Sequence, residues 1–253
     1  MRAGKSVHRL YRDMGMNKHN RKYHEATDSP GPETDKETYR QFNDAEEAEA
    51  WAQRHYADLL GLPPENEIRR SVFFYTGSCY RLYNKLLRDC PPLGSDEFEK
   101  IDFRESREEI AEIQKINKVL LEHTLPENIV VYRFTHKRII RRLCNSKLVH
   151  KGDVFSDRAF FSTTLVRPLL EGFGKENRCD CILKLYLPKG LPGAYVSFKD
   201  GRSCLNEQEF LLPPNIKFRI LRIYGLKYPQ EIECLAIPRD TENSAWHMDA
   251  GRQ

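Results

Sequence analysis

The segment Leu205-Asn-Glu-Gln-Glu-Phe-Leu-Leu-Pro213 carries two glutamates separated by one residue, Glu207 and Glu209. In a β-strand the side chains of residues i and i+2 point to the same face. The segment therefore predicts a strand over 207–212 with two carboxylates about 6 to 7 Å apart on one face. Such carboxylates repel each other in a core but suit a polar or cationic reaction centre. When the pair is considered alone, a solvated edge strand is the alternative interpretation.

The rest of the chain reads as helices followed by strands. Apolar periodicity predicts a helix over 45–60 capped by Asp44, a second over 65–88 interrupted at 75–80, and a third over 106–123. Ser106 and Glu109 form a capping-box pattern at the start of the third. After Pro126, one more helix is expected over 136–147, and β-branched and aromatic residues predict strands over 128–134, 158–164, 180–187, 193–198, 207–212, 216–224 and 230–237. This order predicts an α+β fold with a mostly antiparallel or mixed sheet.

We expect a single folded domain with flexible ends. Residues 1–40 are polar and basic and are expected to form a flexible arm. Residues 41–240 are expected to form the domain, helical over 41–125 and with a β-core over 126–240, and residues 241–253 a C-terminal tail. The chain contains no internal repeat.

Composition limits the classes of protein that remain. The 253 residues carry a formal charge of +4, which permits an anionic partner without arguing for one. The seven cysteines are odd in number and form no Cys-x-x-Cys pair, which favours reduced thiols over a disulfide framework or a metal site. No apolar run is long enough to span a bilayer, and no signal peptide is recognisable. We therefore expect action in a cytosol, with no membrane partner and no metal.

Two further motifs lie on strands expected before the glutamate pair. Arg133 lies near the end of the expected strand, in Val130-Val-Tyr-Arg-Phe134, and a guanidinium binds phosphate or carboxylate oxygens with two parallel hydrogen bonds. Ser162, Thr163 and Thr164 form a run of hydroxyls, and a strand hydroxyl can hold a carboxylate in one rotamer. Considered singly, the arginine is typical of a soluble surface, and the hydroxyl run is common in β-proteins.

An arginine, a Ser-Thr-Thr run and a Glu-x-Glu pair on successive strands resemble the arginine–serine–glutamate class of mono-ADP-ribosyltransferases. The similarity is greatest to bacterial binary toxins that modify actin and to vegetative insecticidal proteins. Residues 75–88 and 182–195 are also similar to this family, so the resemblance covers roughly residues 44 to 225. It implies an ADP-ribosyltransferase-like fold, in which two packed, mostly antiparallel sheets surround a cleft for NAD, the co-substrate.

The resemblance also implies roles for individual residues. Glu209 would bond the ribose 2′-hydroxyl and stabilise positive charge on the ring as nicotinamide leaves, as in glycoside hydrolysis. Ser162 would hold Glu209 and flank the nicotinamide, beside Thr163 and Thr164, and Arg133 would grip the diphosphate.

Two further NAD contacts are implied less directly by the family pattern. Phe173 and Arg178 match an aromatic residue and a phosphate-binding arginine, although the spacing departs from the family pattern. A core phenylalanine and a surface arginine are the alternatives for these two positions.

Glu207 would face the acceptor, and in this family a glutamate there accompanies arginine as the target. A guanidinium has a pKa above 12, so it needs a carboxylate to orient it and to accept its proton. Cys204 stands where actin-modifying toxins have an aromatic residue, and no counterpart of the adaptor half of binary toxins is recognisable. The target is therefore expected to be a protein arginine, with actin in doubt. Nucleic acid as target, motivated by the basic arm and residues 137–147, and a non-catalytic NAD-binding module are the alternatives.

Overall fold

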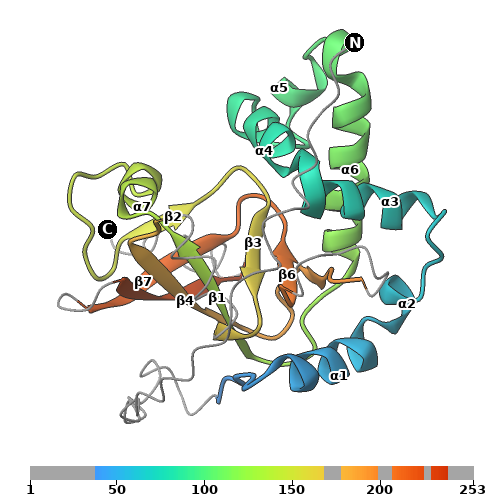
Figure 1. Ribbon diagram of the computed structural model, residues 1–253. Coiled ribbons are helices and arrows are strands. Elements are labelled where there is room, and N and C mark those ends of the chain that lie inside the picture. Colours follow the sequence, from blue (N-terminus) through green and yellow to red (C-terminus); the bar gives the residue numbers. More distant parts are fainter. Residues whose placement is uncertain (1–37, 168–177, 199–206, 225–228, 239–253) are drawn as a thin grey trace, which may run out of the picture. The chain divides into compact units, whose positions relative to one another are not determined.

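The computed structural model describes residues 38–167, 178–198, 207–224 and 229–238 (Figure 1). Most of the expected basic arm and all of the expected tail over 241–253 lie outside these ranges, and the boundaries at 40, 125 and 240 stay predictions. The helices are α1 (Ala45–His55), α2 (Ala57–Leu60), α3 (Glu67–Phe74), η1 (Tyr75–Cys79), α4 (Tyr80–Asp89), α5 (Asp96–Glu99), η2 (Arg104–Ser106), α6 (Arg107–Glu122) and α7 (Lys137–Leu143).

Local signals place several helix starts correctly. The carboxylate of Asp44 accepts a hydrogen bond from the backbone N–H of Glu47 at 2.8 Å, which confirms the predicted N-cap of α1. The capping box predicted at Ser106 is wrong, because its side chain makes no capping hydrogen bond and a turn of 3₁₀-helix precedes α6. Helix α7 ends at Leu143, four residues before the predicted end.

The helix predicted to break at residues 75–80 continues as a π-helical turn. Residues Tyr75–Cys79, labelled η1, join α3 directly to α4. A π-turn places one extra residue in a helix and is common near functional sites. Tyr75, at its start, is buried against Phe160 with ring centroids 5.2 Å apart, so this turn packs directly on the strand region.

The described strands form one continuous sheet rather than the two separate sheets expected, while the α+β class is confirmed. Their order is β2-β7-β8-β4-β1-β3-β6-β5, and all neighbours are antiparallel except β4 and β8. The strands are β1 (Ile129–Thr135), β2 (Val154–Ser156), β3 (Phe161–Thr164), β4 (Cys181–Leu187), β5 (Ala194–Tyr195), β6 (Glu209–Leu212), β7 (Lys217–Tyr224) and β8 (Gln230–Ile237).

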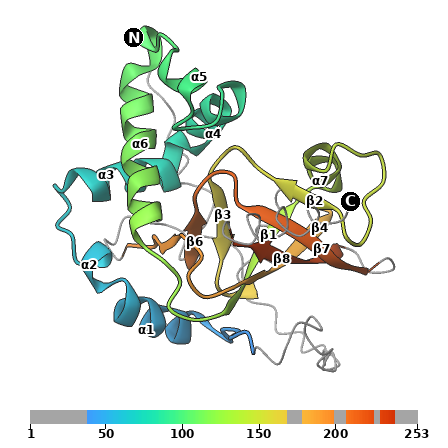
Figure 2. The ribbon, with the colours of Figure 1, turned by 180° about the vertical axis from the view of Figure 1, so that it is seen from behind.

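The pairing between β1 and β3 is much shorter than that between β1 and β4. Strands β1 and β3 are joined through one residue pair, Tyr132 with Thr164, whereas β1 and β4 pair over seven positions. Figures 1 and 2 show β3 and β6 on the side of the sheet that faces helices α3 to α6, and β7 and β8 on the other side of β1. Side chains at the ends of β1, β3 and β6 therefore meet where the two parts of the sheet join.

Strand β6 is supported by aromatic packing from the first helices. The rings of Trp51 and Tyr56 lie 6.5 and 6.1 Å from the ring of Phe210, and all three side chains are buried. The indole N–H of Trp51 donates to the carboxylate of Glu127 at 2.7 Å, so its buried polar atom is satisfied. This packing fixes the strand that begins at Glu209.

Gly193 packs against β6 too closely to accept a side chain. Its φ is +152°, and an added Cβ would lie 2.9 Å from side-chain atoms of Leu212 and Phe210. We expect Gly193→Ala to lower the free energy of unfolding by about 1 to 3 kcal/mol, measured by urea denaturation. Gly77→Ala is the matched control, because an added Cβ there meets no atom within 4 Å. Equal stability of the two variants would contradict this account.

Candidate active site

Arg133, on β1, is held in place by the strand beside it. Its Nη1 donates a hydrogen bond of 2.6 Å to the carbonyl oxygen of Ser162, and its guanidinium carbon lies 4.4 Å from the ring centroid of Phe161. Burial lowers the pKa of Arg133, and the nearby charge of Arg88 lowers it further. An arginine remains protonated even so, so a partly desolvated cation stands at the junction of β1 and β3 that the sequence motifs predict.

Ser162 and Glu209 meet across the pairing of β3 and β6. Thr164 lies opposite Glu209 in the ladder, and Ser162, two residues before Thr164, lies on the same face of β3. Burial raises the pKa of Glu209 to about 7, while a polar contact from the Ser162 side chain and the charge of Arg133 act in the opposite direction. The residue is only 7 % exposed. The structure thus brings the predicted arginine, serine and second glutamate together.

The strand geometry expected for the glutamate pair is wrong, although the two carboxylates do interact. Strand β6 begins at Glu209, and Gln208 has a left-handed φ of +49°, so Glu207 lies outside the alternating pattern. Glu207 is exposed, yet the surrounding protein partly desolvates its carboxyl group and raises its pKa. Its charge also contributes to the raised pKa of Glu209. One carboxylate is therefore buried and the other stands at the surface beside it.

Gln208 holds this turn between the two glutamates. Its side chain is completely buried; its carbonyl oxygen accepts from the hydroxyl of Tyr195 at 2.7 Å, and its amide donates to Glu49 at 3.2 Å. The backbone N–H of Glu209 donates to the hydroxyl of Ser197 at 2.7 Å. These contacts stabilise a left-handed residue that costs energy for any side chain other than glycine. The sequence motif does not reveal this role for its middle residue.

Thr163 and Thr164 position the backbone. The hydroxyl of Thr163 donates to the carbonyl of Phe210 at 2.6 Å, and that of Thr164 donates to the carbonyl of Glu207 at 2.6 Å. Both side chains are buried. Their hydroxyls therefore join β3 to the segment that carries the glutamates, and a contact of either residue with NAD stays a prediction.

The remaining predicted residues are less well defined. Phe173 lies outside the described residues, as does Cys204. Arg178 is exposed and has a left-handed φ of +51°. No described contact joins it to Arg133 or Glu209, so its assignment as a phosphate contact stays a prediction.

Tyr75 and Asn84, which belong to the family-like segment 75–88, lie beside the charged residues. The phenol oxygen of Tyr75 accepts from the side-chain amide of Asn84 at 3.1 Å. Burial raises the pKa of Tyr75, and the negative charge of Glu209 adds to this effect. The π-turn therefore places a neutral hydroxyl close to Glu209. The only signal for this placement in the sequence is the similarity of residues 75–88 to the family.

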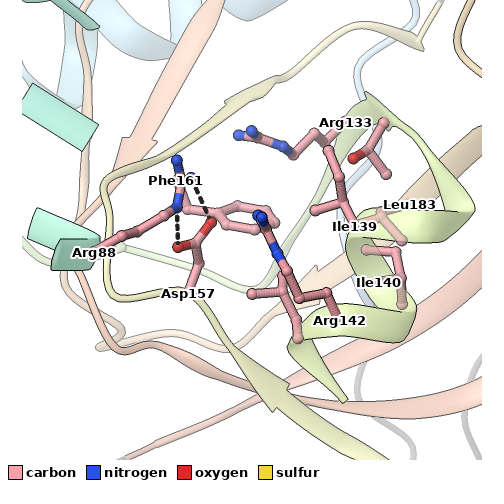
Figure 3. A pocket seen from close by; sticks show the side chains of 10 residues that line it. Arg88, Arg133, Ile139, Ile140, Arg142, Asp157, Phe161 and Leu183 are labelled. Atoms are coloured by element: carbon pink, nitrogen blue, oxygen red, sulfur yellow. Dashed lines mark hydrogen bonds and ion pairs between the residues drawn. The ribbon is translucent and has the colours of Figure 1, made fainter. Parts of the chain in front are cut away.

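A pocket beside Arg133 contains two more arginines, Arg88 from α4 and Arg142 from α7 (Figure 3). Arg88 forms two hydrogen bonds, of 2.8 and 2.7 Å, with the buried carboxylate of Asp157. Ile139, Ile140, Leu143, Phe161 and Leu183 supply most of the apolar wall. Three guanidinium groups face one carboxylate in this lining, which leaves a surplus of two positive charges for an anion.

Comparisons with known proteins identify the family to which the chain belongs. The family model described as ADP-ribosyltransferase exoenzyme matches residues 48–241. The chain belongs to this family. It is therefore an ADP-ribosyltransferase, which confirms the resemblance seen in the sequence motifs.

Solved structures of bacterial ADP-ribosyltransferase toxins have the same fold. Plx2a from Paenibacillus larvae is 22% identical with a TM-score of 0.58, and the match covers 79% of this chain and 100% of Plx2a. C3stau2 from S. aureus, solved with NAD, is 16% identical with a TM-score of 0.61, over 79% of this chain and 99% of C3stau2. BECa, from a binary enterotoxin of C. perfringens and solved with NADH, is 25% identical with a TM-score of 0.56, over 79% of this chain and 50% of BECa.

A comparison with curated protein sequences finds no match. Within the described residues, no helix of this ADP-ribosyltransferase is both long and apolar enough to cross a membrane. The same residues contain no cluster of histidine, cysteine, aspartate or glutamate suited to a metal ion.

The buried carboxyl of Glu209 makes stability depend on pH. Between the unfolded pKa of 4.5 and the folded value of about 7, the unfolded chain releases its proton first, so stability falls as pH rises. We expect Glu209→Gln to raise the free energy of unfolding by up to about 3 kcal/mol at pH 8 and to change it little at pH 4. Urea denaturation at both pH values measures this, with Glu207→Gln as the more exposed control. An unchanged stability at pH 8 would contradict the burial cost.

Proposed function

We propose that this ADP-ribosyltransferase cleaves the nicotinamide–ribose bond of NAD and transfers one ADP-ribose to an arginine side chain of a target protein. The observation that supports this most strongly is the unequal pair of carboxylates, buried Glu209 and exposed Glu207. Glu209 is braced by Ser162 and lies near Arg133. Glu207 stands where a macromolecule can reach it.

Glu209 is suited to the bond-breaking step. As the C–N bond to nicotinamide breaks, its electron pair leaves with nicotinamide and positive charge develops on the ribose. An ionised carboxylate fixed beside that position stabilises the charge without reorganising. The polar contact from the Ser162 side chain favours the ionised form and fixes the rotamer. Removing one such preorganised group typically lowers a rate by about 10²- to 10³-fold.

Glu207 is suited to the acceptor step. An arginine guanidinium is protonated at neutral pH, so a nitrogen can attack the ribose carbon only as it gives up a proton. The raised pKa of Glu207 makes its carboxylate a better proton acceptor than an ordinary surface glutamate. A neutral glutamine at this position could not take the proton, and asparagine as acceptor would not present a charge for Glu207 to orient.

The three-arginine pocket is suited to the diphosphate of NAD, which carries two negative charges. Arg88 is fixed by Asp157, Arg133 by the carbonyl of Ser162, and Arg142 extends toward them from α7 (Figure 3). The like charges of Arg88 and Arg133 repel each other. An anion between them would relieve that repulsion.

Labelled-NAD transfer tests the arginine assignment. In crude lysate, we expect protein labelling to fall by at least about 100-fold in both Glu209→Ala and Glu207→Gln. Release of nicotinamide without an acceptor should be lost in Glu209→Ala but retained in Glu207→Gln. The labelled residue, identified by mass spectrometry, should be arginine. Undiminished labelling in Glu207→Gln, or label on asparagine, would overturn the arginine proposal. Label removed by nuclease and not by protease would support nucleic acid as the acceptor instead.

Neighbouring arginines on α7 test the pocket. The side chains of Arg141 and Arg142 are both exposed, but only Arg142 lines the pocket. We expect Arg142→Gln to raise KM for NAD by about 10-fold, since a charge-assisted hydrogen bond is worth about 1.5 to 3 kcal/mol. The value of kcat should change little, and Arg141→Gln should leave both constants unchanged. An equal KM in the two variants would remove Arg142 from the binding site.

A further inference from the structure

We propose that the corner of the fold made by α7, the following loop and the edge strand β2 docks on a membrane surface rich in anionic phospholipid. This goes beyond the transfer reaction and revises the expectation that the chain has no membrane partner. Three properties of this surface favour a membrane as its partner: its charge, its two protruding aliphatic side chains and its rigid backbone.

The charge is concentrated and of one sign. Residues 137–152 contain six lysines and arginines and no aspartate or glutamate. Arg138, Arg141 and Arg142 are exposed along one ridge of α7, and Lys147 and Lys151 are exposed on the loop. None of these five side chains forms a described ion pair. Three nearby carboxylates already accept hydrogen bonds: Asp153 from the backbone N–H of His150, Asp180 from that of Lys137, and Asp157 from Arg88.

Two aliphatic side chains protrude among these charges. Leu148 is 64 % exposed, the most exposed large apolar side chain described, and Val154 on β2 is 44 % exposed. Val154 pairs with the exposed Arg219 on β7, so the charged surface continues across the sheet edge. Adjacent cationic and aliphatic side chains match the two components of peripheral membrane binding, attraction to anionic headgroups and burial of apolar groups at their boundary.

The loop holds Leu148 outward through its own hydrogen bonds. The hydroxyl of Ser146 donates to the carbonyl of Leu148 at 2.6 Å, and the next residue, Val149, packs against the core. Gly152 donates from its backbone to the carbonyl of Ile220 on β7 at 2.8 Å. The exposed position of Leu148 is thus fixed by neighbours on both sides, which reduces the entropic cost of inserting it.

The same features disfavour nucleic acid as the occupant. Proteins that bind single-stranded nucleic acid stack its bases on exposed aromatic rings. Between residues 137 and 156 no Phe, Tyr or Trp is exposed, because Phe155 in this segment is buried. A phosphate backbone would use the charges but would gain nothing from Leu148. Since Arg142 belongs both to this ridge and to the arginine pocket, docking here would bring that pocket close to the membrane surface.

Vesicle co-sedimentation of the full chain tests the proposal. We expect binding to phosphatidylcholine vesicles containing about 30% phosphatidylserine, weakening with salt, and no binding to pure phosphatidylcholine. Each basic side chain near such a surface strengthens binding by about fivefold, so the double variant Lys147→Glu, Lys151→Glu should bind more than about 20-fold more weakly. The control Lys100→Glu, Arg107→Glu makes the same change in net charge at exposed positions at the end of α5 and the start of α6, and should bind normally.

Leu148→Ser separates a membrane from a nucleic acid, because it removes the aliphatic side chain and keeps every charge. We expect it to weaken binding to anionic vesicles by about fivefold or more while leaving any shift of duplex DNA or RNA unchanged. Absence of binding to anionic vesicles, or equal loss in the control double variant, would overturn the proposal. The proposal would also be overturned if the protein bound nucleic acid but no vesicles, and if the Lys147→Glu, Lys151→Glu variant lost that nucleic-acid binding. The readout needs no NAD, so it stands or fails separately from the transfer reaction.

Discussion

The hydrogen bond from Arg133 to the carbonyl of Ser162 is the interaction on which the rest of the site depends. It crosses the point where the sheet is joined by the single pair Tyr132 and Thr164, so it fastens two parts of the fold as well as two parts of the site. Without it, β1, which carries the partly desolvated Arg133, and β3, which carries Ser162, would be held in register with each other by little more than that one residue pair. A polar contact in place of extended ladder pairing leaves the junction open to a ligand.

Burying the charged groups of this site costs free energy, and the shifted pKa values of Glu209 and Arg133 show that cost. Glu209 is buried enough to raise its pKa to about 7, and Arg133 is desolvated enough to lower its own. A fold selected only for stability would replace such groups with apolar side chains, because pairing rarely repays desolvation in full. Their retention is consistent with the proposed site for a cationic transition state, and the aromatic packing of Trp51 and Tyr56 under β6 helps to offset the free-energy cost.

Much of this site could be predicted because its residues lie on strands. The order of Arg133, Ser162 and Glu209 along the chain identified three residues that the structure brings together. The conformation between the glutamates could not be predicted, since a left-handed Gln208 has no local signal and is held by distant partners. Arg142 was missed because the sequence of a basic helix does not indicate which of its arginines lines a pocket. Strand β2, of three residues, was missed because its pairing with β7 is a tertiary effect.

The π-turn η1 makes the spacing of the first helices more critical than their composition. An α-helix turns by about 100° per residue, so one extra residue in a regular helix would rotate everything that follows by that angle, whereas the wider π-turn over Tyr75–Cys79 takes up the extra residue locally. Asn84 is thereby kept against Tyr75, and Arg88 against Asp157. An irregular turn thus acts as the spacer that keeps a helical layer aligned with the charged groups beneath it.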